Sequence, residues 1–216
     1  MPTTSPPTVA VVDYGAGNLR SVAKALERSG LRPVVTGDPD ALASCAGIVL
    51  PGVGAFPDAM AELQRRGLDE ALAAAVDRGV FYLGLCLGLQ LLFDESDEHG
   101  VHPGLGWLPG RVERFADQAA GGERLCVPHI GWNEVRFEGD HPVVSRLPER
   151  DHYYFVHSYR AVAAGSDCVV GWTDYGGAFA AAVARDNVLA VQFHPEKSQQ
   201  AGRRLLDGFR DWIEAS

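Results

Sequence analysis

The sequence predicts one α/β domain with a mixed, mostly parallel sheet and helices on both faces. In the first half, short apolar runs that end in glycine-rich turns alternate with segments that carry apolar residues at helical spacing. After about residue 105, short strand-like runs follow one another between turn residues. The chain has 216 residues, which is ample for one core. The alternation favours right-handed crossovers and a parallel sheet, and the second half favours an antiparallel part.

The first half contains four predicted strands and three predicted helices. The strands are short and apolar, as expected for a sheet covered on both faces. The helices end at glycines, which are favoured just beyond a helix C-terminus. The strands are expected within 9–18, 33–37, 47–56 and 80–86, and the helices over 19–30, 58–67 and 68–79.

The second half is predicted to be β-rich and to close with one helix. Strands are expected over 110–115, 153–160, 168–176, 178–186 and 188–194, and an exposed loop over 117–124. Residues 198–215 predict an amphipathic helix. Its apolar face carries Ala201, Leu205, Leu206, Phe209, Trp212 and Ile213. Residues 1–8 are rich in proline and threonine, and we expect a disordered tail before a domain over 9–216.

Composition excludes several classes of protein. The formal net charge of −9 argues against nucleic-acid binding, because phosphate recognition needs a basic face. No apolar run approaches the roughly 18 residues that span a bilayer, and the N-terminus lacks the pattern of a signal peptide. The four cysteines form no CxxC pair, which predicts reduced thiols in a cytoplasmic protein and no structural metal.

The stretch DYGAGNLR begins like a dinucleotide-binding fingerprint. Gly15 and Gly17 follow a predicted strand, but Arg20 stands where the third glycine would be. Two glycines alone are a weak signal. A tight turn, or a surface that meets a partner, is the preferred interpretation.

The stretch GLCLGLQ places Cys86 between Gly84 and Gly88, where a strand is predicted to run into a helix. A nucleophile on such a sharp turn needs small neighbours, which is the arrangement of a nucleophile elbow. A helix N-terminus would favour the thiolate, and the amide of Leu87 would face a developing oxyanion. Taken alone, this pattern is equally compatible with a buried core cysteine.

The stretch VQFHPEKS supplies the partners that a nucleophilic cysteine needs. His194 ends a predicted strand and Glu196 follows two residues later, with Pro195 between them. A histidine base takes the thiol proton, and a carboxylate fixes its tautomer. Because active sites gather at the carboxyl ends of strands in open α/β sheets, we expect Cys86 and His194 to lie close together. The turn in LPGVGAF would contribute further backbone N–H donors.

Together these residues resemble the class I (triad) glutamine amidotransferases. The elbow of that family, G-x-C-x-G-x-Q, matches Gly84, Cys86, Gly88 and Gln90, and its H-P-E motif matches 194–196. The resemblance implies a single flavodoxin-like α/β domain and a thiol nucleophile served by a histidine and a glutamate. Within the family, DYGAGNLRSV, PGVGAF, HIGWN, YFVHSY and VQFHPEKSQ are similar to the glutaminase subunits of imidazole glycerol phosphate synthases.

The resemblance also implies a reaction and a substrate site. Cys86 would attack the side-chain amide of glutamine, and water would hydrolyse the γ-glutamyl thioester to release glutamate. The oxyanion donors would be the backbone around Gly52 and Val53, together with Leu87. The residues that would hold glutamine are Gln90, Glu98, Ser158 and Tyr159, and a carboxylate at Glu98 suits an α-ammonium group. No cofactor is implied. From the residues alone, the alternative for Glu98 is a solvated residue of the acidic loop DESDEHG.

A separate partner is implied as well, a (β/α)8-barrel cyclase subunit that receives the ammonia. It would make imidazole glycerol phosphate and an aminoimidazole carboxamide ribotide in histidine biosynthesis. The interface residues carried over from the resemblance are Asn18, His129, Trp132 and Lys197, although a tryptophan here is as often buried. Weak glutaminase activity without the loaded partner would follow if the PGVG backbone must reorient to present its donors.

Three other interpretations remain open at this point. The first is a different glutaminase of the same class, such as the pyridoxal phosphate synthase subunit, against which HIGWN and DYGAGN argue. The second is a free-standing hydrolase of γ-glutamyl peptides, which would need no partner. The third is a flavodoxin-like binding protein, which would leave His194 and Glu196 unexplained.

Overall fold

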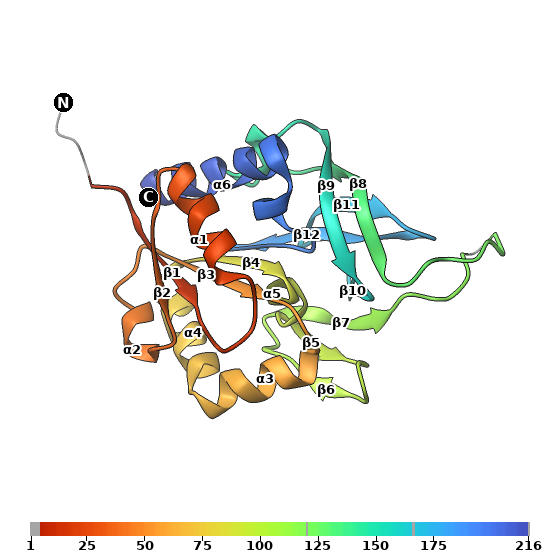
Figure 1. The fold of residues 1–216 in the computed structure, drawn as a ribbon, viewed down its shortest axis with the longest axis horizontal. Helices are drawn as coiled ribbons and strands as arrows, with labels where there is room; N and C mark the ends of the chain where they lie inside the picture. Colours follow the sequence, from red (N-terminus) through yellow and green to blue (C-terminus); the bar gives the residue numbers. More distant parts are fainter. Residues whose placement is uncertain (1–4, 120, 166, 216) are drawn as a thin grey trace.

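The computed structural model describes residues 5–119, 121–165 and 167–215 (Figure 1). A sheet of nine strands has the order β2-β1-β3-β4-β13-β12-β11-β8-β9. A smaller sheet has the order β10-β7-β5-β6. The predicted α/β class and the mixed sheet are confirmed. The second sheet was not predicted.

The parallel half of the large sheet comes from the first half of the chain and one late strand. Its pairings β2/β1, β1/β3, β3/β4 and β4/β13 are parallel. The strands are β1 (Thr8–Val12), β2 (Arg32–Thr36), β3 (Gly47–Gly52), β4 (Phe81–Cys86) and β13 (Val188–Val191). Between them run α1 (Leu19–Arg28), α2 (Pro39–Leu42), α3 (Phe56–Arg65) and α4 (Leu68–Asp77). These bounds follow the predicted segments closely, apart from the short α2.

The rest of the large sheet is antiparallel throughout, from β13 to β9. It consists of β8 (His129–Phe137), β9 (Arg150–His157), β11 (Val169–Asp174) and β12 (Ala178–Arg185). The 3-10 turns η1 (Val144–Arg146) and η2 (Pro195–Lys197) and the helix α6 (Gln199–Glu214) complete this half. The small sheet contains β5 (Phe93–Ser96), β6 (His102–Pro103), β7 (Leu108–Arg114) and β10 (Tyr159–Ala163).

Two apolar cores lie on opposite faces of the large sheet. Side chains alternate between faces along a strand, so Val9 and Val11 enter one core and Ala10 and Val12 the other. Helices α1 and α6 cover the first core, and α3, α4 and the small sheet cover the second. The pattern predicted for the closing helix is confirmed, because its six apolar residues are all buried.

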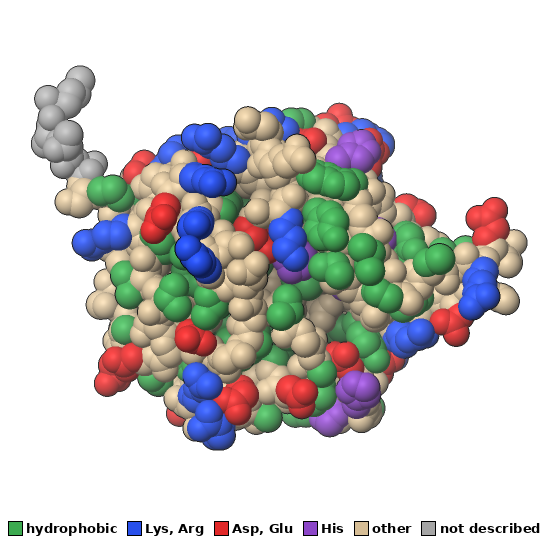
Figure 2. Space-filling model, in the orientation of Figure 1, with side chains coloured by type: hydrophobic (Ala, Val, Ile, Leu, Met, Phe, Trp, Pro, Cys, Tyr) green, Lys and Arg blue, Asp and Glu red, His purple; other side chains and the backbone are tan. Residues whose placement is uncertain are grey.

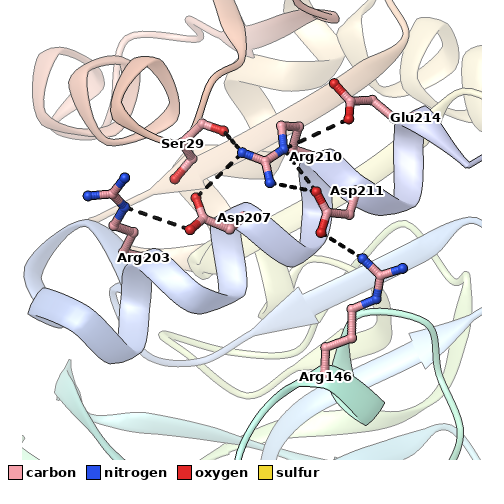
Figure 3. Close-up of polar contacts among 7 residues, drawn as sticks. All are labelled: Ser29, Arg146, Arg203, Asp207, Arg210, Asp211 and Glu214. Atoms are coloured by element: carbon pink, nitrogen blue, oxygen red, sulfur yellow. Dashed lines mark hydrogen bonds and ion pairs between the residues drawn. The ribbon is translucent and has the colours of Figure 1, made fainter.

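An ion-pair cluster on α6 holds the helix against its neighbours (Figure 3). The guanidinium of Arg210 donates from Nη1 to the carbonyl of Ser29 at 2.9 Å, just beyond the end of α1. It also donates to Asp211 Oδ1 from Nη2 at 2.6 Å. Asp211 in turn accepts from Arg146 of η1 at 2.7 Å. The cluster thus joins α6 to α1 and to the η1 turn.

We expect Arg210→Ala to lower the free energy of unfolding by about 1 kcal/mol, because a charge-assisted bond to a backbone carbonyl is lost with the ion pairs. The matched control is Arg203→Ala, whose more exposed side chain pairs, among the described residues, with Asp207 at 3.7 Å. Urea unfolding at 0.1 and 1 M NaCl measures the free energy of unfolding of both variants. Equal losses for the two variants would contradict the role given to the Ser29 contact.

The structure departs from the predicted segments in several further places. The segment predicted as one strand over 153–160 is two strands, because the chain leaves the large sheet after His157 and enters the small one at Tyr159. The helix predicted after Cys86 is a single turn, α5 (Leu87–Gln90), and β8 was not predicted. Of the predicted tail 1–8, residues 1–4 lie outside the described residues, and Thr8 already belongs to β1.

Within the described ranges, none of the helices is long and apolar enough to cross a membrane.

Candidate active site

The carboxyl ends of the parallel strands bring the predicted catalytic segments to one edge of the large sheet. Gly52 at the end of β3 pairs with Cys86 at the end of β4. Leu85 pairs with Val191 at the end of β13, three residues before His194. The turn after β3, the nucleophile turn and the H-P-E segment therefore lie together, as the sequence predicted.

Cys86 sits on a strained turn between β4 and α5. Its φ of 55° and ψ of −104° are unusual for a residue with a side chain. Both flanking glycines are needed for space. A Cβ on Gly84 would overlap the carbonyl of Gly88, and a Cβ on Gly88 would overlap the carbonyl of Leu50. Such strain at a cysteine that lines a cavity fits a nucleophile better than a core residue.

Because α5 is one turn long, the predicted support of the thiolate by a helix dipole comes from that turn alone. Other groups around the sulfur therefore matter more than the sequence suggested.

His194 is fixed by its backbone and its ring. Its N–H donates to the carbonyl of Tyr154 at 2.9 Å, and its carbonyl accepts from Ser198 Oγ at 2.6 Å. The ring atom Nδ1 lies 2.9 Å from Oε1 of Glu196, and both side chains are about 95% buried. The carboxylate therefore accepts from Nδ1 and leaves Nε2 for proton transfer. Among the described residues, Nε2 has no hydrogen-bond partner.

The protonation of His194 is tied to the cysteine. Burial lowers its pKa, but the Cys86 sulfur in its thiolate form and the Glu196 carboxylate outweigh burial and raise the pKa to about 10. A raised pKa means that the imidazolium is stabilised in this site. The arrangement thus favours a histidine that holds the proton taken from the thiol.

The turn after β3 separates two cavities. Val53 and Gly54 line a cavity of about 350 Å³ that also contains Cys86, and a second cavity of about 230 Å³ next to Tyr14. Gly54 has a φ of 108°, a conformation that favours glycine. A Cβ on Gly52 would overlap the hydroxyl of Tyr14, so glycine is required there too. The turn has open space on both sides.

The larger cavity, which we call the Cys86 cavity, gathers every residue predicted to hold the substrate. Its lining includes Gln90, Glu98, Ser158 and Tyr159. Glu98 is half-buried, and its Oε2 accepts from the N–H of Phe56 at 2.7 Å. The alternative of a solvated residue is therefore wrong. Ser158 and Tyr159 reach the cavity because the chain changes sheets there.

The predicted interface residues fall into two groups. Asn18, Trp132 and Lys197 are exposed, and Trp132 is 47% exposed, so the alternative of a core tryptophan is wrong. The Lys197 ammonium lies 5.8 Å from the ring of Tyr154. Hydrophobic side chains gather over β8 and β9 (Figure 2), where Ile130 is 58% exposed.

His129 does not belong with them. The prediction of a surface contact is wrong for this residue, which is 3% exposed and stacks on Phe155 and Tyr175. Alternation along β8 turns it inward while Ile130 faces outward.

Two polar residues of the site were missed by the sequence analysis. Gln192 is fully buried, and its Nε2 lies 3.5 Å from Sγ of Cys86. His157 is buried beside the cavity, where its Nδ1 lies 2.8 Å from the carbonyl of Tyr159. For Gln192 the only sequence signal was a glutamine at the end of an apolar strand. For His157 there was no signal.

A second large cavity lies at the opposite ends of β4 and β13. Its volume is about 410 Å³, and Trp107, Arg185 and Asn187 line it. The polar side chains there are already bonded to backbone carbonyls, Arg185 to Trp107 and Asn187 to Val76 and Val80. Across the described residues, no group of three or more His, Cys, Asp or Glu side chains is arranged to hold a metal ion.

Comparison with known proteins agrees with this geometry. Residues 10–211 match the family model of glutamine amidotransferase class-I. The imidazole glycerol phosphate synthase subunit HisH of Aromatoleum aromaticum is 52% identical over 209 residues, which cover 94% of this chain and 98% of that protein. HisH of Syntrophotalea carbinolica is 50% identical over 204 residues, covering 94% and 99%.

Solved structures share the fold at lower identity. PurLQS from Thermotoga maritima has a TM-score of 0.74 at 22% identity, covering 97% of this chain and 100% of that chain. The glutaminase domain of Trypanosoma brucei CTPS with bound acivicin has a TM-score of 0.67 at 18% identity, covering 97% and 94%. From the family match and the half-identical relatives, we conclude that the chain belongs to the class-I glutamine amidotransferases and, among them, to the family of the imidazole glycerol phosphate synthase subunit HisH.

Proposed function

We propose that this chain is the glutaminase subunit of an imidazole glycerol phosphate synthase. It hydrolyses glutamine to glutamate and ammonia and passes the ammonia to a separate cyclase subunit in histidine biosynthesis. The observation that carries the proposal is the buried pair of His194 and Glu196, aligned at 2.9 Å beside a strained cysteine in a cavity. The relatives named HisH support the subunit assignment.

In the proposed reaction, Sγ of Cys86 attacks the side-chain amide carbon of glutamine while Nε2 of His194 takes the thiol proton. The oxyanion forms near the amide of Leu87 and the backbone of Gly52 and Val53. The imidazolium then protonates the leaving ammonia, and a γ-glutamyl thioester remains. Water, deprotonated by His194, attacks that thioester, releases glutamate and restores the thiol. Glu196 keeps the ring in the tautomer that each step requires.

The Cys86 cavity offers a matching site for glutamine. Glu98 supplies a carboxylate for the α-ammonium group, and its place is set by the bond from the Phe56 amide. Gln90 and the segment Ser158–Tyr159 contribute polar groups on another wall. A cavity of about 350 Å³ is of the size that encloses a small ligand.

Activation by the partner would act on the turn after β3. The turn is flanked by cavities of about 350 and 230 Å³, and Gly54, with its φ of 108°, permits a change of backbone direction. A partner that binds one arrangement of the turn more tightly would shift the population towards it. The exposed Ile130 and Trp132, together with Asn18 and Lys197, are the side chains proposed to meet the cyclase.

The test is glutamate release by the purified chain, alone and with its cyclase subunit and nucleotide substrate. We expect low activity alone, a steep rise with the loaded partner, and loss of activity in Cys86→Ala, because no other group replaces the thiolate. The matched control is Cys126→Ala, which removes the exposed cysteine and leaves the activity unchanged.

High activity that ignores the partner would contradict the subunit assignment and favour a free-standing hydrolase. Full activity in Cys86→Ala would contradict the mechanism itself.

A further inference from the structure

A buried side-chain amide, that of Gln192, faces the nucleophile and has no role in the reaction described above. Gln192 is 0% exposed and lies between the end of β13 and His194. Its Nε2 is 3.5 Å from Sγ of Cys86, within hydrogen-bonding range for sulfur, and its Oε1 accepts from Nε2 of Gln90 at 3.1 Å. A fully buried amide needs hydrogen-bond partners for its polar atoms, and these two contacts supply them.

The direction of this amide follows from its neighbours. Nε2 of Gln90 also donates to the carbonyl of Tyr159 at 2.9 Å. A backbone carbonyl only accepts, so the amide nitrogen of Gln90 must face it. The same nitrogen then faces Gln192, which must present its oxygen there. The N–H donors of Gln192 are thereby turned towards the sulfur.

The carbonyl of Tyr159 is itself held in place. It lies 2.8 Å from Nδ1 of His157, and Nε2 of His157 lies 3.0 Å from Nδ1 of His129. Burial lowers the pKa of His157 to about 3 and that of His129 to about 4, so both rings are neutral at pH 7. The proton of His157 lies on Nδ1, towards the carbonyl, and the proton of His129 lies on its own Nδ1. The group that orients Gln90 is therefore anchored in the core.

We propose that Gln192 is a positioning residue that donates a hydrogen bond to the Cys86 sulfur and stabilises its anionic form. A thiolate accepts hydrogen bonds better than a thiol does, so a fixed donor favours the reactive form. The donor also holds the sulfur within reach of His194. Because Gln90 lines the Cys86 cavity, the nucleophile and one wall of the substrate site form a single hydrogen-bonded unit.

The proposal rests on the proposed function for its role in turnover, but the first test does not require turnover. In a Cys126→Ala background, alkylation of Cys86 by iodoacetamide is followed against pH by mass spectrometry. Gln192→Met keeps the length of the side chain and removes the donor. We expect the pH midpoint of Cys86 alkylation to rise by about one unit, which corresponds to a tenfold weaker preference for the thiolate.

The second variant replaces the donor by an acceptor. Gln192→Glu keeps the acceptor for Gln90 but presents a carboxylate oxygen to the sulfur. Because that carboxylate also repels a thiolate, we expect the midpoint to rise further in Gln192→Glu than in Gln192→Met. A parent midpoint in Gln192→Met would mean that Gln192 only supports Gln90. Glu is also nearly isosteric with Gln, so it serves if the Met variant does not fold. Gln200→Met, an exposed position on α6, is the control.

In turnover, we expect kcat of both variants to fall at least tenfold, with KM for glutamine within about threefold. Folding is checked by thermal melting. A folded Gln192→Glu or Gln192→Met protein with the parent alkylation midpoint would overturn the proposal. A raised midpoint in a chain that does not hydrolyse glutamine would uphold it while the proposed function failed.

Discussion

We expect Gly88→Ala to reduce glutamine hydrolysis at least about 100-fold and to lower the free energy of unfolding by about 3 kcal/mol. An alanine Cβ would lie well inside 3.0 Å of the Leu50 carbonyl oxygen, and real Cβ atoms essentially never approach so closely. That oxygen belongs to the backbone of β3 and has no freedom to move away. Relief would require the turn after Cys86 to shift away from β3, which carries Gly52 two residues further on.

The measurements are steady-state glutamate release and thermal melting. A loss of about 3 kcal/mol lowers the melting temperature by roughly 10 °C for a chain of this length. Gly121→Ala is the matched control, since a Cβ there meets no atom of the described residues within 4 Å and its φ lies outside the left-handed region. Parent-like activity in Gly88→Ala would show that the nucleophile turn tolerates displacement and would contradict the tight packing against β3.

Acid should destabilise the protein between pH 6.5 and about pH 4, by about 2 kcal/mol for each buried neutral histidine at pH 5. Burial lowers the pKa of His129 and of His141 to about 4, and that of His157 to about 3. In the unfolded chain these histidines take up protons near pH 6.5, whereas in the native state they stay neutral until the pH is much lower. Their contribution is therefore complete above pH 6.5 and is lost as the pH falls.

The contribution of His194 to stability depends on pH in the opposite direction. Its pKa is raised to about 10, so its contribution is lost as the pH rises towards 10 and is already complete below pH 6.5. His194 therefore does not contribute to the loss of stability between pH 6.5 and about pH 4.

Urea unfolding at pH 7, 6 and 5 tests the acid prediction, with His157→Gln as the variant. Glutamine donates to the Tyr159 carbonyl as His157 does, but it takes up no proton in this range. We expect a protein that is less stable at pH 7 and that loses less stability on acidification than the parent. An unchanged loss between pH 7 and pH 5 would contradict the assignment of the titration to His157. His141 titrates in both proteins and cancels from the comparison.

Local motifs were the most informative part of the sequence. The elbow GLCLGLQ and the segment HPE each describe a turn whose geometry is set by neighbouring residues, so they predicted where Cys86, His194 and Glu196 would lie. Strand and helix bounds in the first half were predicted well for the same reason. Periodicity and terminal glycines are local signals, and the parallel crossovers follow from them.

The small sheet and the change of sheet after His157 were not predictable in this way. The segment YYFVHSYR is uniformly strand-like, and nothing in it marks the point where hydrogen bonding passes from β8 to β7. That point depends on pairings with residues more than 20 positions away. It decides that Ser158 and Tyr159 reach the Cys86 cavity.

The sequence by itself determined the α/β class, the parallel character of the first half of the sheet and the positions of Cys86, His194 and Glu196 at or just beyond strand ends. Only the tertiary structure decided that His129 is buried while Trp132 is exposed, that Glu98 joins the cavity, and that Gln192 faces the sulfur. Burial and hydrogen-bond direction belong to pairs of residues brought together from distant positions. A one-dimensional pattern shows which residue types are available, and packing selects the contacts that they make.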